Sequence, residues 1–267
     1  MMSPLFESLI VNSMILLPLE SDNENPLEGG EMENYTRTGS EAGPQFKLQL
    51  NDKDVNLEEL EDLIGYSRLK TVGELWLDRN DFGDEGVELI ASMEELRKLR
   101  VLSLAGNKLT DRAVSALAQT KTLVNLKRLF IQVNTMGPEG VVSLGQSPAM
   151  ASLEFLYLKQ NPLGPDGAKA LAGSSAIKGI KELYLGRTRL RNDGLAVLCN
   201  GRPWPNLTTL SLAQNGLDDK STEMLADTQS FPNLVTLDLY GNRISDEAVD
   251  IIKNSPHLKS LRALQVN

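Results

Sequence analysis

The chain has 267 residues and a formal net charge of −9 at pH 7, with 41% hydrophobic and 5% aromatic residues. One cysteine, Cys199, and one histidine, His257, exclude an intrachain disulfide and make a Cys/His zinc site or a catalytic Cys–His pair improbable. Basic residues (27) are fewer than acidic ones (36), so the composition does not fit a nucleic-acid-binding protein.

Residues 1–44 differ in composition from the rest of the chain. They hold eight acidic residues and one basic residue, whereas residues 45–267 are near neutral with 26 basic and 28 acidic residues. This polar, Gly- and Pro-containing makeup predicts a disordered leader over residues 1–44, whose removal should leave folding intact. An apolar stretch from Leu9 to Leu19 is too short to span a bilayer, and the absence of any basic residue before Arg37 argues against an export signal.

From residue 45 onward one motif recurs every 27 residues without insertion, for example as "LSLAGNKLTDRAVSALAQT" (102–120). Its first strand column contains Leu75, Leu102, Leu129, Leu156, Leu183, Leu210 and Leu237. The column two residues later contains Leu77, Leu104, Ile131, Leu158, Leu185, Leu212 and Leu239. Because alternate side chains of a strand share one face, these columns predict short strands whose leucines point inward.

A turn and a helix follow each strand. The turn carries an asparagine column, Asn80, Asn107, Asn134, Asn161, Asn215 and Asn242, with Thr188 as the one exception. Such amides can bond the backbone groups that a tight turn leaves unpaired. The next column, Asp84, Asp111, Asn192, Asp219 and Asp246, is typical of helix N-caps, and Pro138 and Pro165 share it. The helix that follows is expected to bury an apolar stripe beside a column of small residues that includes Cys199.

The period also extends to both ends of the repeated region. Leu48 and Leu50 lie one period before the first complete copy, and Leu264 and Val266 lie one period after the last, so nine strands are predicted. The first copy has the acidic helix expected of an N-terminal capping repeat. The last copy stops after its strand, and we expect this edge to support weak self-association.

The pattern L-x-x-L-x-L-x-x-N, seen in "LRVLSLAGN" (99–107) and "LVTLDLYGN" (234–242), resembles the leucine-rich repeat family. Period and helical second half are most similar to its ribonuclease-inhibitor-like branch, and "GAKALA" resembles repeats common in bacterial members. The resemblance implies an α/β horseshoe over residues 45–267, with about eight repeats and a terminal strand. A parallel sheet would line its concave face, helices would cover the convex face, and the ligands would be proteins.

The residues that flank the inward leucines are predicted to line the concave face. Their middle column reads Trp76, Ser103, Phe130, Tyr157, Tyr184, Ser211 and Asp238, and Phe155 and Tyr240 lie beside it. Six of the 13 aromatic residues therefore lie on this face, accompanied by Arg128, Lys159 and Arg187. Neighbouring strands are ~4.8 Å apart, so the central rings should form a ladder. Exposed aromatic and arginine side chains favour a binding patch, and the alternative is that the rings merely cover one another.

Other conspicuous residues have structural explanations. The aspartates of the cap column need no catalytic role, and Trp204 and Phe82 fall in columns of apolar core residues. No glycine-rich phosphate loop or calcium loop is present. No active site, metal site or cofactor is therefore expected.

These features predict a non-enzymatic module that binds a protein partner on its concave face, with neither nucleic acid nor membrane as a partner. The candidate partner-binding residues are Trp76, Arg128, Phe130, Phe155, Tyr157, Lys159, Tyr184, Arg187 and Tyr240. A cytoplasmic location fits the single cysteine. Two alternatives stay open: a regulator of a small GTPase, since the branch includes the GTPase-activating protein of Ran and Arg79 or Arg187 could act in trans, and a secreted bacterial effector that binds a host protein.

Overall fold

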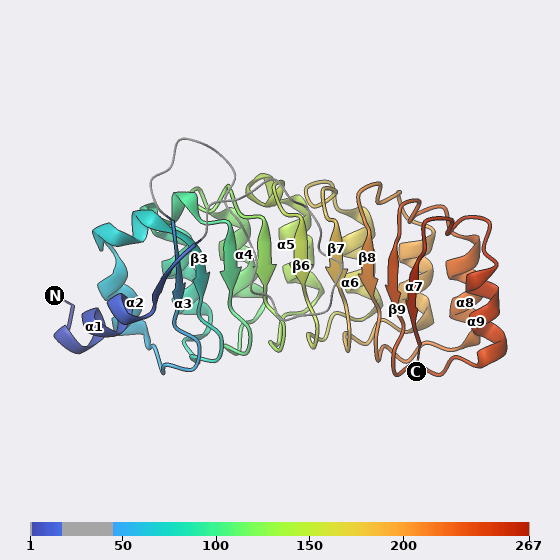
Figure 1. Cartoon of the computed structure of the whole chain (residues 1–267), viewed down its shortest axis with the longest axis horizontal. Coiled ribbons are helices and arrows are strands. Elements are labelled where there is room, and N and C mark those ends of the chain that lie inside the picture. The colour runs from blue at the N-terminus through green and yellow to red at the C-terminus, as the bar shows by residue number, and fades with distance from the viewer. Residues whose placement is uncertain (1, 18–44, 267) are drawn as a thin grey trace.

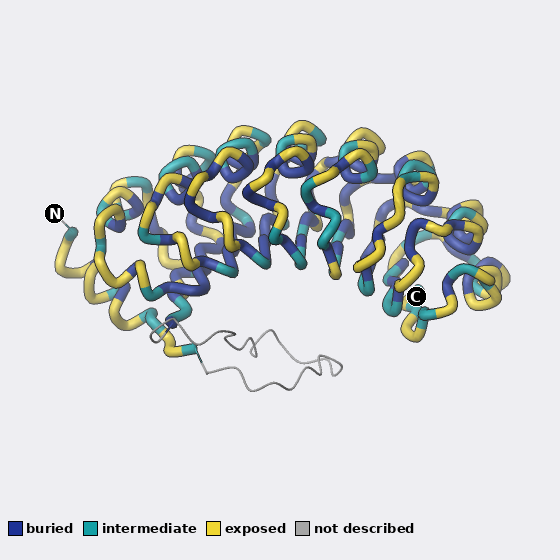
Figure 2. Tube along the Cα trace, turned by 90° about the horizontal axis from the view of Figure 1, so that it is seen from above, coloured by how far each residue is buried: buried dark blue, intermediate teal, exposed yellow. Residues whose placement is uncertain are grey.

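A computed structural model describes residues 2–17 and 45–266. They form one curved solenoid whose strands line the inner side and whose helices cover the outer side (Figures 1 and 2). The strands are β1 (Met14–Leu16), β2 (Phe46–Gln49), β3 (Val72–Trp76), β4 (Val101–Ser103), β5 (Arg128–Phe130), β6 (Phe155–Tyr157), β7 (Glu182–Tyr184), β8 (Thr209–Ser211), β9 (Thr236–Asp238) and β10 (Ala263–Gln265). The helices are α1 (Pro4–Asn12), α2 (Leu57–Leu63), α3 (Gly83–Ser92), α4 (Asp111–Gln119), α5 (Pro138–Gln146), α6 (Gly164–Gly173), α7 (Arg191–Cys199), α8 (Asp219–Asp227) and α9 (Asp246–Lys253). Short 3-10 turns occupy Ser67–Thr71, Glu94–Lys98 and Pro148–Met150.

The ten strands form one sheet in chain order, and all neighbouring pairs are parallel except β1 with β2. Each strand pairs with the residue one period away, as in Leu102 with Leu129 and Leu156 with Leu183. These leucines are completely or almost completely buried between sheet and helices, in one continuous core. The nine predicted strands are confirmed as β2–β10.

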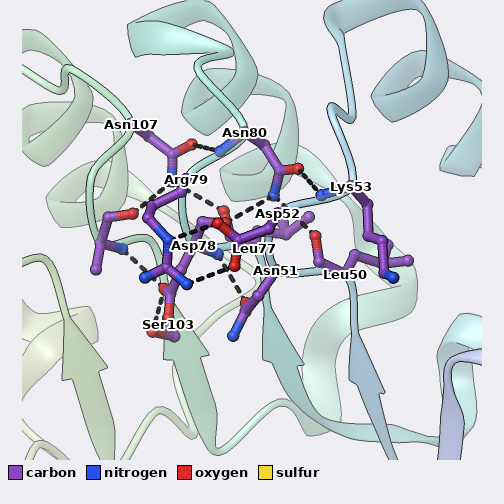
Figure 3. Close-up of polar contacts among 11 residues, drawn as sticks. Leu50, Asn51, Asp52, Lys53, Leu77, Asp78, Arg79, Asn80, Ser103 and Asn107 are labelled. Atoms are coloured by element: carbon purple, nitrogen blue, oxygen red, sulfur yellow. Dashed lines mark hydrogen bonds and ion pairs between the residues drawn. The ribbon is translucent and has the colours of Figure 1, made fainter.

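Asparagines join each repeat to its neighbours, as the turn column predicts (Figure 3). The buried Asn107 donates from Nδ2 to the Leu77 carbonyl (2.9 Å), and its Oδ1 accepts from the backbone N–H groups of Asn80 (2.8 Å) and Asp81 (2.9 Å). The bond to the carbonyl 30 residues earlier recurs at Asn80, Asn134, Asn161, Asn215 and Asn242. At the exception, the Thr188 hydroxyl donates to a carbonyl of its own repeat (2.6 Å).

The aspartate column does not cap its own helices, which corrects the expectation from the sequence. The side-chain caps lie one residue earlier in α4, α8 and α9, at Thr110, Asp218 and Ser245. Asp84 instead accepts from the backbone N–H (2.8 Å) and hydroxyl (2.5 Å) of Thr110, in the next repeat. Asp111 likewise accepts from the N–H groups of Gly137 (2.8 Å) and Gly140 (2.6 Å), at the start of α5. These carboxylates therefore stabilise the following helix and the stacking of repeats.

The predicted disordered leader is wrong for its first part. Ser3 caps α1 by accepting from the Phe6 N–H, Pro4 opens the helix, and Phe6 and Ile10 are buried against the first repeat. The strand β1 then adds to the sheet antiparallel to β2. The solenoid is therefore capped by α1 and β1, because the first repeat alone would leave its apolar face open to water. The rest of the leader prediction, over 18–44, lies outside the described residues.

Candidate functional site

A stack of aromatic rings runs across the concave face from β3 to β7, with one ring from each of these five strands except β4. The rings of Tyr157 and Tyr184 stack with centroids 4.2 Å apart and planes within 9°, and Phe130 stacks on Tyr157 at 4.3 Å. Trp76 reaches Phe130 at 5.4 Å from two strands away, since the residue between them in the register is the small Ser103. The predicted ladder is therefore present and extends by one ring, from β3 to β7.

Cations contact two of the concave aromatic rings. The guanidinium carbon of Arg128 lies 3.9 Å from the centroid of the Phe155 ring, and the ammonium of Lys47 lies 4.5 Å from that of Trp76. Such contacts stabilise the pair by ~0.5–2 kcal/mol, more when water is excluded. Burial lowers the pKa of Arg128 to about 10, partly offset by the charges of the tyrosines and glutamates around it.

Two carboxylates hold the polar ends of the ring stack, and the sequence interpretation did not single them out. The Tyr184 hydroxyl donates to Glu182 (2.9 Å), and the Trp76 indole N–H donates to Glu74 (3.0 Å). Burial raises the pKa of Glu74 and, with Glu182 nearby, raises the pKa of Tyr157 to about 12. Each glutamate lies two residues before its aromatic partner and therefore on the same face of the strand, so the two-residue period of a strand could have identified both.

The exposed part of the ring stack is smaller than the sequence predicts. Trp76, Phe130 and Arg128 are only 8%, 1% and 6% exposed, so they support the surface and do not present contact area to a partner. The burial of Trp76 and Phe130 follows from the stacking itself and from packing with Val101. The rings that stay partly exposed are Tyr157 and Tyr184, together with Phe155.

The remaining candidate residues surround the exposed end of the stack. Lys159 and Arg187 are exposed just beyond β6 and β7, and the Arg187 Nε donates to the Gln214 side chain. Tyr240 is 47% exposed beyond β9, separated from Tyr184 by β8. The predicted residues thus divide into a buried support on β3–β5 and an accessible surface on β6–β9.

A polar network joins the residues that follow β2 and β3 to β4, near the N-terminal end of the solenoid (Figure 3). Asp78 is mostly buried and accepts from the Ser103 hydroxyl and the Ala105 N–H (2.9 Å), and burial raises its pKa. Arg79 is held by Asp52 through an ion pair (Nε–Oδ1 2.6 Å). These groups satisfy one another, which is the arrangement of a structural network.

Chemistry of other kinds finds little support in the described residues. The Cys199 thiol is buried, and burial raises its pKa to about 12, so it is a poor nucleophile. No group of three or more potential metal ligands occurs in residues 2–17 and 45–266. No helix in the same ranges is long and apolar enough to cross a membrane.

Comparisons with known proteins agree with the fold. Family models described as Leucine Rich repeat match residues 70–91, 95–118, 149–172 and 205–226, and a related Leucine Rich Repeat model matches 233–255. No match was found among curated proteins. Among solved structures, the chain is similar to one in the yeast Rad7–Elc1 complex (18% identity, 80% of this chain, TM-score 0.52) and to an internalin, InlF, of Listeria monocytogenes (17%, 79%, 0.48). This chain spans 58% and 65% of the lengths of those two proteins.

Proposed function

We propose that the chain, whose fold is a leucine-rich repeat solenoid, is a non-enzymatic interaction module whose protein partner lies against the concave wall from β6 to β9. The observation that carries the proposal is the pair of stacked, partly exposed tyrosines, Tyr157 and Tyr184, on a buried aromatic support. Rigid aromatic side chains lose little entropy on binding and are enriched at the centres of interfaces.

The charges around the tyrosines suggest the chemistry of the partner surface. Lys159 and Arg187 are exposed just beyond the C-terminal ends of β6 and β7, and Phe155 and Tyr240 add apolar area. An apolar partner segment with acidic or carbonyl groups beside it would match this arrangement. The Rad7–Elc1 neighbour is itself in a protein complex, which is consistent with a protein partner here.

The other functional assignments follow from the same residues. The 27-residue period with a helix in each repeat supports the ribonuclease-inhibitor-like branch, and the free, buried Cys199 is compatible with a cytoplasmic location. The GTPase-regulator alternative is less favoured because one of its two candidate arginines, Arg79, is already engaged by Asp52.

The test is the double variant Tyr157→Ala/Tyr184→Ala. We expect affinity for a partner, identified by affinity capture and mass spectrometry from the source cell, to fall tenfold or more, since a central aromatic anchor contributes ~2 kcal/mol or above. The free energy of unfolding should fall by only about 1 kcal/mol, the loss of ring stacking.

A matched control removes two exposed apolar side chains from the convex helices, Val142→Ala/Ile251→Ala, and should leave affinity unchanged. A second reference is Leu156→Ala, on the buried face of the same strand, which should cost ~2–5 kcal/mol in stability. If the tyrosine variant is as unstable as Leu156→Ala, the rings are structural. If it is stable and binds every partner with native affinity, the interface lies elsewhere.

A further inference from the structure

The loop between β7 and α7 carries three exposed arginines at alternate positions. Arg187, Arg189 and Arg191 are exposed, whereas the residues between them, Thr188 and Leu190, are completely buried. The Thr188 hydroxyl donates to the Leu185 carbonyl (2.6 Å), and Leu190 belongs to the core. The alternation therefore anchors the loop while it directs three guanidinium groups to the surface.

The backbone of this loop is held in an unfavourable conformation for arginine. The φ angles of Arg187, Arg189 and Arg191 are 57°, 63° and 55°, in the left-handed region. Where the column of Arg191 adopts this conformation in other described repeats, the residue is glycine: Gly83 (φ 63°) and Gly164 (φ 60°). An L-residue with a side chain costs roughly 1–2 kcal/mol there. Positive φ is common at the other two positions, since Val133 and Gln160 share it in the column of Arg187 and Lys108 shares it in the column of Arg189. Arg191 is therefore the one arginine that stands where the other left-handed residues are glycine, and its strain is a reason to look for a function.

Cations of two other loops are neutralised by the preceding repeat. Arg79 pairs with Asp52, and Lys108 Nζ lies 2.6 Å from Asp81 Oδ2; both carboxylates stand 27 residues earlier (Figure 3 shows the first pair). The two loops thus carry little excess charge.

The three arginines have no such neutralisation. The residues 27 positions before them are Gln160, Pro162 and Gly164, which are uncharged. Within residues 2–17 and 45–266, none of the three forms an ion pair.

Two carboxylates, one close to the arginines in the sequence and one a period later, lie at the N-terminal ends of helices. Asp218, one period after Arg191, accepts from the Asn192 side chain (2.6 Å) and the Lys220 N–H (3.0 Å) as the cap of α8. Asp193 lies in the first turn of α7. Among the described residues, Arg189 and Arg191 therefore have no carboxylate partner, and Arg187 contacts the neutral Gln214 side chain through Nε, so the three guanidinium groups keep donors for an external anion.

We infer that Arg187, Arg189 and Arg191 form a binding surface for an acidic peptide segment of a protein partner. The inference rests on the proposed interaction function but places a second, charge-specific contact on the loop edge, beyond the aromatic wall. Guanidinium forks bind carboxylates in a bidentate manner, which suits a run of Glu or Asp side chains. A peptide is favoured over a nucleic acid because residues 45–267 have two more acidic than basic residues, so a long polyanion would gain few further contacts.

The test measures binding of a fluorescein-labelled hexaglutamate peptide to the full-length protein by fluorescence anisotropy. The variant Arg189→Gly/Arg191→Gly places glycine where other repeats already use it with positive φ, at Gly216 and Gly164. We expect it to bind the peptide at least tenfold more weakly, while its melting temperature stays the same or rises. The matched control, Arg79→Gln/Lys108→Gln, removes two cations that are already paired and should change the affinity by less than twofold.

Several results would overturn the inference. They are the failure of hexaglutamate to bind the wild-type protein, equal binding by the glycine variant, or a sharp fall in that variant's melting temperature, which would make the arginines structural. Tighter binding of a twelve-residue oligothymidylate than of hexaglutamate, lost in the same variant, would replace the peptide by a nucleic acid.

The outcome is separable from that of the proposed function. Tyr157→Ala/Tyr184→Ala should bind hexaglutamate as well as the wild type does, since its arginines are intact. If hexaglutamate binding requires the arginines while the tyrosine variant keeps its partner, the aromatic wall is refuted and the loop surface stands. If the tyrosine variant loses its partner while hexaglutamate binds equally with and without the arginines, the reverse holds.

Discussion

The N-terminal cap gives the sharpest test of how this solenoid is stabilised. Helix α1 contributes Phe6 and Ile10 to the core, at 2% and 0% exposure, whereas Leu5 on the same helix is 85% exposed. Ile10→Ala removes buried methyl and methylene groups and should cost ~2–5 kcal/mol of the stability of this end. Leu5→Ala removes apolar atoms that are already exposed to water. It should therefore change the free energy of unfolding by no more than about 0.5 kcal/mol.

The loss should first appear locally. In a solenoid each repeat contacts only its neighbours, so a weakened cap frays the first repeat before the whole chain unfolds. The hydrogen bonds that tie the cap to the sheet, from Leu17 N–H to the Gln45 carbonyl (2.9 Å) and from Gln49 N–H to the Ser13 carbonyl (3.0 Å), open in that step.

Amide hydrogen exchange combined with urea denaturation measures both effects. In Ile10→Ala, exchange should accelerate in β2 and α2 while β6–β9 stay protected, and Leu5→Ala should match the wild type throughout. Equal exchange in Ile10→Ala and the wild type would show that α1 does not pack on the first repeat. The same result would restore the original expectation that residues 1–44 are dispensable for folding.

Three further predictions concern charge and the sheet edge. Burial raises the pKa of Glu74 in the folded protein above 4.5. The free energy of unfolding contributed by this carboxyl group therefore falls as the pH rises from 4.5 to the pKa of the folded state. Over that interval, Glu74→Gln should become more stable relative to the wild type. Burial opposes ionisation of Glu154 as well, but hydrogen bonds and charges from two lysines outweigh it and lower the pKa of this carboxyl group. Glu154→Gln should therefore be less stable than the wild type at neutral pH, and the difference should vanish in acid. Urea denaturation between pH 3 and pH 7 checks both, and identical trends in the two variants would contradict the assignment. In the described residues β10 pairs with β9 alone, so we propose that the protein self-associates weakly through this edge. The variant Ala263→Lys/Gln265→Lys should abolish the association. Analytical sedimentation that shows only monomer at the highest attainable concentration would refute the proposal.

Most of the fold was predictable because one period fixes it. Once Leu102 and Leu129 are placed one repeat apart, the strand register, the inward leucines and the asparagine ladder follow from alternation and stacking. The role of Asp84 and Asp111 was not predictable in the same way. Their partners lie in the next repeat, and the bonds depend on how closely two loops stack, which no single copy of the motif reveals.

The N-terminal cap was missed although its signals were present. Ser3 before Pro4 is a helix start, and Phe6 and Ile10 have helical spacing. The acidic composition of residues 1–44 as a whole outweighed these few residues. Composition averages over a segment, whereas a cap needs only one buried face.

The candidate site shows a similar division between what is periodic and what is not. The strand columns correctly place Phe130, Tyr157 and Tyr184 in one ladder. They do not show that Trp76 reaches across a serine to complete it, or that Phe130 and Arg128 become almost completely buried. Ring orientation and mutual coverage depend on side-chain rotamers, which a column of residue types does not specify.

Charge in this solenoid is balanced between repeats, at the same spacing as the backbone pairing. Asp52 with Arg79, Asp81 with Lys108, and Glu154 with Lys127 and Lys181 all lie 27 residues apart. A parallel stack places equivalent residues of neighbouring repeats side by side, so an opposite charge one period away is the natural partner of each surface ion.

The same geometry lets the sequence show where a partner is missing. The arginines of the loop after β7 lie 27 residues after Gln, Pro and Gly, which carry no charge. An exposed pair is worth only ~0–1 kcal/mol, so folding does not require such a partner, and a loop can keep its cations for an external ligand at little cost in stability. The buried Thr188 and Leu190 anchor this loop, and Arg191 keeps a left-handed conformation that glycine adopts at the equivalent positions Gly83 and Gly164.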